Sequence, residues 1–233
     1  VEDTKKHSTG AFLHVGQVTQ GKIAVGAKVT ATIDEEKRQA IRLNHSATHL
    51  LHAALRQVLG EHVTQKGSMV NAERLRFDFS HFEPVTTDQI QEIEKIVNEQ
   101  IRSNVEASIE VMGFDDAIKA GAMALFDEKY GDDVRVIGMG DFSTELCGGT
   151  HVERIGDIGL FKILSEGGIA SGVRRIEAAT GQKAVDYILS QGRILSQMAD
   201  MLKGNRDDVA ERVDTLLKDK KELEKELEAL KAK

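Results

Sequence analysis

Two pairs of metal-binding side chains, far apart along the chain, are the feature that most limits how this sequence can fold. His45 and His49 are four residues apart, and Cys147 and His151 enclose the run Cys-Gly-Gly-Thr-His. In an α-helix, residues i and i+4 project from the same face, so two imidazoles at this spacing can bind one ion. The glycines allow the second segment to turn sharply enough to bring a thiolate and an imidazole to the same point. Four such donors are the set that one Zn²⁺ takes, so we predict a zinc site that joins a helix to a distant loop.

The other histidines and the single cysteine indicate that the chain has one metal site of this kind. His7, His14, His52, His62 and His81 form no second pair with ligand spacing, so we expect structural roles for them. Cys147 is the only cysteine, which excludes an internal disulfide and fits a reducing compartment. We therefore expect a cytoplasmic protein whose one thiol binds metal.

The length and the charge of the chain limit which kinds of protein it can be. The 233 residues suffice for one sizeable domain with an extension, and a start at Val1 with an end inside a charged repeat suggests a piece of a longer protein. No apolar run is long enough to span a bilayer, and we expect no membrane partner. The net charge of -7 argues against a non-specific nucleic-acid binder. It is uneven, because residues 1–76 hold 11 basic against 7 acidic residues, whereas residues 88–145 hold 5 against 14.

The first half of the chain predicts short strands and then a long helix. Residues 10–33 alternate apolar and polar positions between glycines, which predicts small antiparallel strands that include 24–25 and 28–33. The acidic run 34–36 is a helix start, and apolar residues recur with helical spacing as far as Gly60. This helix would carry His45 and His49 in its middle.

Alternating strands and helices follow Gly60. We expect strands near 63–70 and 75–79, a helix capped at 86–88 that runs to Ile101, a strand over 105–112 and a helix from Phe114 to about Gly121. Residues 134–139 predict one more strand, which we expect to lead directly into the loop that carries Cys147.

A glycine-rich segment, 165–172, separates two further predicted strands, 159–164 and 173–178. A hairpin of this kind can approach a phosphate or sugar closely, although its plainer interpretation is a flexible turn. Two arginines follow it and could bind a phosphate backbone. The candidate RNA-binding residues are Gly167, Gly168, Arg174 and Arg175.

From Ile188 onward the apolar residues keep a spacing of 4 and 3, interrupted by Arg206 and Lys220. That spacing predicts a coiled-coil seam. The final stretch balances Lys against Glu, which favours a solvated helical arm over a nucleic-acid tail and allows self-association through the arm.

Three motifs resemble one known family. His-Ser-Ala-Thr-His-Leu-Leu from residue 45, Cys-Gly-Gly-Thr-His from 147 and Gly-Val-Arg-Arg-Ile-Glu-Ala from 172 look like the editing domain of alanyl-tRNA synthetase. The editing domain of threonyl-tRNA synthetase and freestanding editing proteins share the zinc pattern but are less similar between these motifs. The resemblance implies an α+β fold in three parts: the end of a β-barrel domain over 1–34, a zinc-dependent editing domain over 35–187 and the start of a helical region over 188–233. The ATP-binding part that activates alanine has no counterpart in this chain.

This resemblance also implies an activity, which is hydrolysis of the ester between serine or glycine and tRNA(Ala). A pocket shaped for alanine cannot sterically reject a smaller side chain and rejects an added hydroxyl only weakly, so a second, hydrolytic site is needed. By motif position, His45, His49, Cys147 and His151 take the roles of zinc ligands, with Cys147 also at the reacting centre. Gln65 matches a glutamine of the editing pocket, where its amide could hold the substrate hydroxyl or a water molecule. Thr48 could point into the same cleft or serve only in packing.

The role of the metal stays open from the sequence. Ser46 stands where a metalloprotease motif would have its glutamate, so protease chemistry is not expected. If all four donors bind, the ion shapes the pocket, whereas a loose donor would leave a position for water to attack the ester. A different class of protein also fits, namely a structural-zinc module that holds tRNA without hydrolysing anything.

Overall fold

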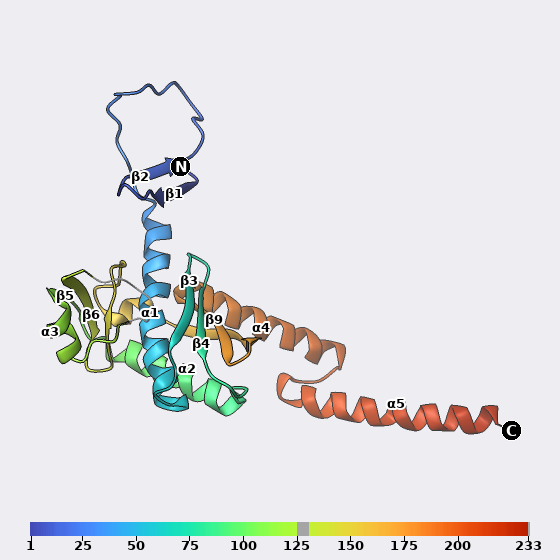
Figure 1. Cartoon of the computed structure of the whole chain (residues 1–233). Coiled ribbons are helices and arrows are strands. Elements are labelled where there is room, and N and C mark those ends of the chain that lie inside the picture. The colour runs from blue at the N-terminus through green and yellow to red at the C-terminus, as the bar shows by residue number, and fades with distance from the viewer. Residues whose placement is uncertain (125–130, 233) are drawn as a thin grey trace. The chain divides into compact units, whose positions relative to one another are not determined.

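The structure is a computed structural model that describes residues 1–124 and 131–232. The chain divides into two compact units, Val1–Asp34 and Glu35–Lys233. The chain combines helices with sheets whose strands all pair antiparallel, so the predicted α+β class is confirmed (Figure 1). No helix among the described residues is long and apolar enough to cross a membrane.

The first unit is a single hairpin followed by extended chain. Strands β1 (Asp3–Lys6) and β2 (Phe12–Val15) pair antiparallel, with Asp3 opposite Val15. The strands predicted at 24–25 and 28–33 are absent, so that prediction is wrong. An alternation of apolar and polar residues makes a segment suitable for a strand, but a strand also needs a partner. Residues 24–25 and 28–33 have no strand beside them within the unit. Every residue of the unit is exposed, including Phe12 and Val25, so it has no core of its own.

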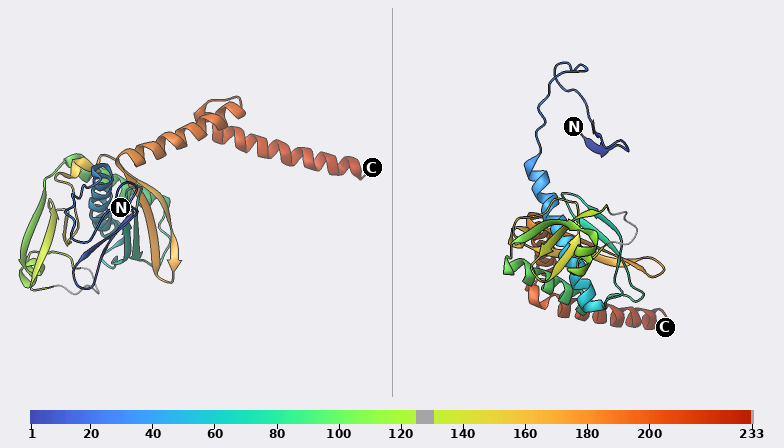
Figure 2. Two further views of the ribbon diagram at one scale, coloured as in Figure 1. Left: turned by 90° about the horizontal axis from the view of Figure 1, so that it is seen from above. Right: turned by 60° about the vertical axis from the view of Figure 1, so that its left-hand side comes forward.

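A central helix, α1 (Glu35–Leu59), organises the second unit. Glu35 and Glu36 lie in its first turn, where carboxylates stabilise the positive end of the helix dipole. The helix stops before Gly60, whose φ of 115° is disfavoured for other residues. Residues 46–52 are all buried, because the strands of a four-stranded sheet, helix α2 and strand β7 of a second sheet all pack against the helix (Figures 1 and 2).

The larger sheet has the order β3-β4-β9-β8 and is antiparallel throughout. Its strands are β3 (Gln65–Val70), β4 (Leu75–Ser80), β8 (Phe161–Ala170) and β9 (Val173–Thr180). In β4 the alternate residues Leu75, Phe77 and Phe79 are fully buried in the main core. The glycine-rich segment is therefore mostly strand, and only a tight turn at 171–172 joins β8 to β9.

Helix α2 (Thr87–Ser103) covers the outer edge of β8. Thr86 and Gln89 form a capping box at its start. Asn98 accepts from the N–H of Phe161 at 3.0 Å and donates to its carbonyl at 2.9 Å, and Glu94 accepts from the N–H of Ile163. These side chains form hydrogen bonds with backbone groups of β8 that have no neighbouring strand to pair with.

The smaller sheet has the order β5-β6-β7 and leads to the second pair of predicted metal ligands. It comprises β5 (Ala107–Gly113), β6 (Asp133–Met139) and β7 (Ser143–Leu146), with the short helix α3 (Phe114–Lys119) after β5. We expected β6 to enter the Cys147 loop directly, and this is wrong, because β7 lies between them. A tight turn through Gly140, with φ of 60°, reverses the chain after β6. A 3₁₀ turn, η1 (Ile155–Ile158), follows the loop.

The C-terminal arm consists of two helices. Helix α4 (Gly181–Met201) spans the domain boundary expected at 187/188, and α5 (Val209–Lys231) follows a 3₁₀ turn, η2 (Arg206–Asp208). A seam interrupted at Arg206 and Lys220 was expected; the helix is broken near Arg206, whereas α5 runs without a break through Lys220. Lys203 adopts a left-handed φ of 52°, which ends α4.

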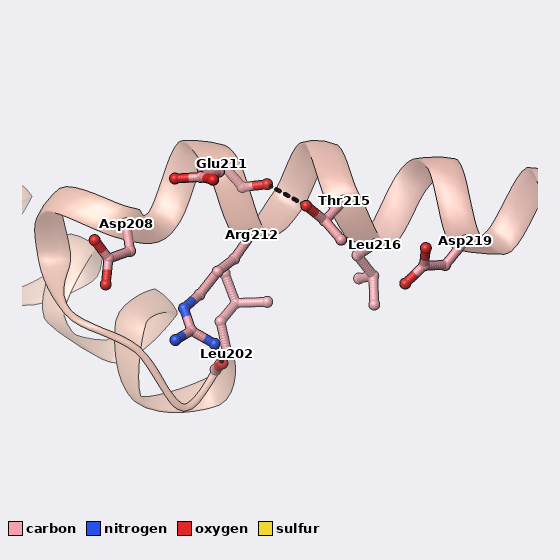
Figure 3. A pocket seen from close by; sticks show the side chains of 7 residues that line it. All are labelled: Leu202, Asp208, Glu211, Arg212, Thr215, Leu216 and Asp219. Atoms are coloured by element: carbon pink, nitrogen blue, oxygen red, sulfur yellow. Dashed lines mark hydrogen bonds between the residues drawn. The ribbon is translucent and has the colours of Figure 1, made fainter.

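The side chain of Arg212 holds this break. It packs over Gly204, where a side chain would collide with it, and it donates to the carbonyl oxygen of Leu202 at 3.1 Å. Figure 3 shows the surface hollow at the break and the bond from Thr215 to the Glu211 carbonyl. The hollow is lined by Leu202, Asp208, Glu211, Arg212, Thr215, Leu216 and Asp219.

Candidate metal centre

The fold brings the four predicted metal ligands together. His45 and His49 project from α1, and Cys147 and His151 come from the loop that follows β7. One donor atom from each residue lies within 4.8 Å of the others. The Cys147 Sγ is 3.5 Å from His45 Nε2 and 3.3 Å from His151 Nε2.

The two distances from Cys147 Sγ fit the edges of a tetrahedral zinc site. Zinc bonds of about 2.0–2.3 Å imply donor-to-donor edges of roughly 3.3–3.7 Å. His49 Nε2 is buried and has no hydrogen-bond partner among the described residues. A buried ring nitrogen without a partner is costly unless something else pairs with it, and a metal ion in the cluster would do so. The residues present therefore fit a bound zinc ion.

Backbone contacts hold the loop against the helix. Arg135 donates to the carbonyl oxygens of Cys147 at 2.8 Å and Gly149 at 2.6 Å, and Arg42 donates to that of His151 at 2.7 Å. A Cβ at Gly149 would overlap the His45 ring, so the close approach of loop and helix requires glycine there. Neither arginine belongs to a motif that points to this role.

A buried carboxylate lies behind the cluster. Glu145 accepts from His49 Nδ1 at 2.6 Å and from His52 Nδ1 at 3.0 Å. Sequence reasoning missed Glu145. The available signal was the spacing of two between Glu145 in β7 and Cys147 just after it, which places both on one side while the chain stays extended. His52, expected to be structural, is 1% exposed and packs its ring 5.2 Å from that of Phe77.

The buried group contains charges of both signs. Burial raises the pKa of the Cys147 thiol, but hydrogen bonds from His151 and His45 and the nearby charge of His49 outweigh it and lower the pKa to about 3. Burial likewise raises the pKa of Glu145, but His49 and His52 bring it down to about 2. Burial lowers the pKa of His49, yet Glu145 and Cys147 raise it to about 10. Two anions, Cys147 and Glu145, thus stabilise positive charge at His49, and a metal ion bound at its Nε2 would take the place of the second ring proton.

One other histidine pair forms in the structure. His62 Nε2 and His81 Nδ1 are 2.8 Å apart, with their rings stacked. The sequence showed no such pair, because 19 residues separate them and only the strand geometry brings them together. Burial and the neighbouring His62 lower the pKa of His81.

Gln65 lies at the start of β3, opposite Phe79. Cross-strand partners project from the same face of a sheet, so Gln65 lies on the face that carries Phe77 and Phe79 into the core beneath α1. Its side chain is half-buried. None of the hydrogen bonds found among the described residues joins its amide to the four donors, and its role stays a prediction.

Thr48 is buried between the two histidines of α1. Its hydroxyl donates to the Asn44 carbonyl of its own helix at 2.9 Å. The hydroxyl is therefore already paired within the helix. This agrees with the second of the two roles expected for Thr48, which is packing.

Both candidate phosphate-binding arginines already have carboxylate partners. Arg174 makes a bidentate pair with Glu166, with one bond of 2.9 Å, and Arg175 makes one with Asp78 at 2.7 and 2.8 Å. In the sheet Gly167 stands opposite Arg175 and Gly168 opposite Arg174. The two glycines are thus strand residues beside neutralised charges, and only the Arg175 side chain, 34% exposed, offers much surface to a phosphate.

Comparisons with known proteins agree with this arrangement. Residues 134–177 match the family model described as the threonyl and alanyl tRNA synthetase second additional domain. That match includes Cys147, His151 and both arginines. Alanine–tRNA ligase of Methylococcus capsulatus is 58% identical over the whole chain, and the ligases of Stenotrophomonas maltophilia and Xanthomonas axonopodis pv. citri are each 55% identical over the same length. The chain spans only 26–27% of the length of these relatives.

Proposed function

Since this chain is a fragment of an alanyl-tRNA synthetase, we propose that residues 35–187 are its editing domain, which hydrolyses seryl-tRNA(Ala) and glycyl-tRNA(Ala). Such hydrolysis complements a synthetic site that cannot reject glycine by sterics and rejects serine weakly. The free thiol of Cys147 fits a reducing compartment, so we place this activity in the cytoplasm.

The exposure of the four donors is the observation that carries this proposal. His49 and His151 are buried, whereas His45 and Cys147 are partly exposed, so the cluster is not sealed from solvent. A purely structural ion has no need of such access. An ester at the end of a tRNA does need it.

Each residue then has a defined task. His45, His49, Cys147 and His151 hold the ion, which supplies Lewis-acid chemistry when bound, either by polarising a carbonyl or water or by shaping the pocket. Gln65 uses its amide to bind the serine hydroxyl or to orient the attacking water. An alanyl substrate has no hydroxyl and would leave this amide unpaired. Arg135 holds the loop by its backbone, and the buried Glu145 contacts His49 behind the ion.

The tRNA is the proposed macromolecular partner, together with the remaining domains of the same polypeptide. We assign acceptor-end contacts to Gly167, Gly168, Arg174 and Arg175, and leave Thr48, whose hydroxyl is paired within α1, in a packing role. Both guanidinium groups already pair with carboxylates. Contacts to the tRNA would therefore come from the exposed part of the Arg175 side chain and from backbone groups more than from unpaired positive charge. The exposed leucines of α5, including Leu223 and Leu227, support self-association of the arm as a further proposal.

A structural zinc site without hydrolysis is the competing function. The burial of two donors, and the presence of four rather than three protein ligands, favour it, because catalytic zinc sites commonly keep one position open.

One experiment separates the two functions. The protein is incubated with seryl-tRNA(Ala), before and after zinc is removed with a chelator, and released serine is measured. We expect hydrolysis that stops on zinc removal and returns when zinc is restored. Hydrolysis at the uncatalysed rate by zinc-loaded protein that still binds the tRNA would contradict the editing role and support the structural one.

A further inference from the structure

Both oxygens of one buried carboxylate are committed to histidines of α1. Glu145 is 3% exposed, and its Oε2 and Oε1 accept from His49 Nδ1 and His52 Nδ1 respectively. Glu145 does not belong to the four-donor group itself. It touches one of the four metal ligands and one histidine that is not a ligand.

This contact determines which nitrogen of His49 can bind a metal. A carboxylate only accepts hydrogen bonds, so an imidazole paired with it must carry its proton on Nδ1. The lone pair of the neutral ring is then on Nε2. In His49 this is the buried atom that has no other hydrogen-bond partner among the described residues.

The bond to His52 prevents the carboxylate from turning away. His49 and His52 are one helical turn apart on α1, so both can reach the same carboxylate. His52 is itself held against Phe77, with ring centroids 5.2 Å apart. The large sheet is thereby connected to the metal centre through Phe77, His52 and Glu145.

We propose that Glu145 is a positioning residue, which His52 holds in place and which fixes His49 in the tautomer that presents Nε2 to the metal. This inference rests on the metal centre of the proposed function. It adds a role for two residues that do not contact the ion. Partners behind metal-binding histidines are known to fix tautomer and ring orientation in this way.

Zinc affinity of the whole 233-residue chain, measured by competition with a chromogenic chelator, tests the proposal. Glu145→Gln keeps the shape of the side chain, but its amide can accept from only one of the two rings. We expect zinc binding to weaken by roughly 10- to 100-fold, in the range found for such partners. Glu153→Gln is the matched control, because Glu153 is an exposed glutamate two residues after His151. The zinc affinity of this variant should equal that of the parent.

A second measurement covers the case in which Glu145→Gln does not fold. Long-range ¹H–¹⁵N spectra of the zinc-loaded parent report the tautomer of each histidine, and we expect His49 to carry its proton on Nδ1. Metal on Nδ1 of His49, or unchanged zinc affinity in folded Glu145→Gln, would overturn the positioning role while leaving the metal centre intact. A parent that binds no zinc would instead overturn both proposals.

Discussion

Gln65 is the residue whose proposed role depends least on the metal. It lies on the core-facing side of β3 opposite Phe79, whereas the four donors come from α1 and the loop after β7. A change at this residue can therefore alter hydrolysis without altering the metal content.

We expect Gln65→His to slow deacylation of seryl-tRNA(Ala) while bound zinc stays the same. The loss of one hydrogen bond to the substrate or to water should raise the barrier by about 1–3 kcal/mol, roughly a tenfold to hundredfold loss of rate. Deacylation of seryl- and alanyl-tRNA should be measured beside zinc content. Unchanged rates on both substrates would remove Gln65 from the pocket, and zinc loss would mean that the substitution acts through the fold.

Asp78 gives the fold a pH dependence that can be measured separately from the metal centre. Hydrogen bonds from Arg175 hold the pKa of Asp78 below its ordinary value of 3.8. A carboxyl with a depressed folded-state pKa stabilises the fold fully above its unfolded value, and this contribution is lost as the pH falls through the folded value.

We therefore expect the metal-free parent to lose more unfolding free energy on acidification than Asp78→Asn. The comparison uses urea unfolding of both proteins at about pH 6 and about pH 3, on either side of the unfolded pKa. Equal losses in the two proteins would show that the pair with Arg175 does not contribute to the acid sensitivity.

At the scale of elements, the metal centre depends on how closely one loop approaches one helix. Arg42 and Arg135 hold the loop by its backbone, and Gly149 allows it to lie against the His45 ring. Only the packing of β7 beside α1 brings these segments together.

Gly149→Ala should weaken zinc binding because its Cβ would push the loop away from His45. Crowding of this kind costs about 1–3 kcal/mol, which corresponds to roughly a 5- to 150-fold loss of affinity. Gly148→Ala is the control, since a Cβ there meets nothing within 4 Å. Titration of both variants with zinc tests this, and equal affinities would show that the loop shifts at little cost.

At the scale of the whole molecule, the core of the second unit does not depend on the ion. It is built from apolar side chains of α1, α2 and the large sheet, among them Leu50, Phe77 and Ile93. Cys147 only packs against the edge of this core.

We expect Cys147→Ala to lose zinc and deacylation but to keep its helix and sheet content. Far-UV circular dichroism and thermal unfolding should match those of the parent after chelation, because both lack the stabilisation that a bound ion adds. Complete unfolding of the variant would instead favour a structural zinc site, whose binding energy is folding energy.

The features that the sequence determines by itself are local. The helix over 35–59, the capped helix after Thr86 and most strands of the second unit follow from periods of 3.6 and 2 and from end signals a few residues long. The four metal donors were readable for the same reason, because each pair lies within one turn of helix or one short loop.

The tertiary structure decided everything that depends on a partner distant in the sequence. Glu145 lies against His49 and His52, and Arg175 against Asp78, because strand register and helix packing place them there. The expected strands at 24–25 and 28–33 lack neighbours to pair with, and the arm bends where Arg212 packs over Gly204. Periodicity describes which face of an element is apolar. It carries no information about which side chain of another element will meet that face, since that contact depends on packing of the whole chain.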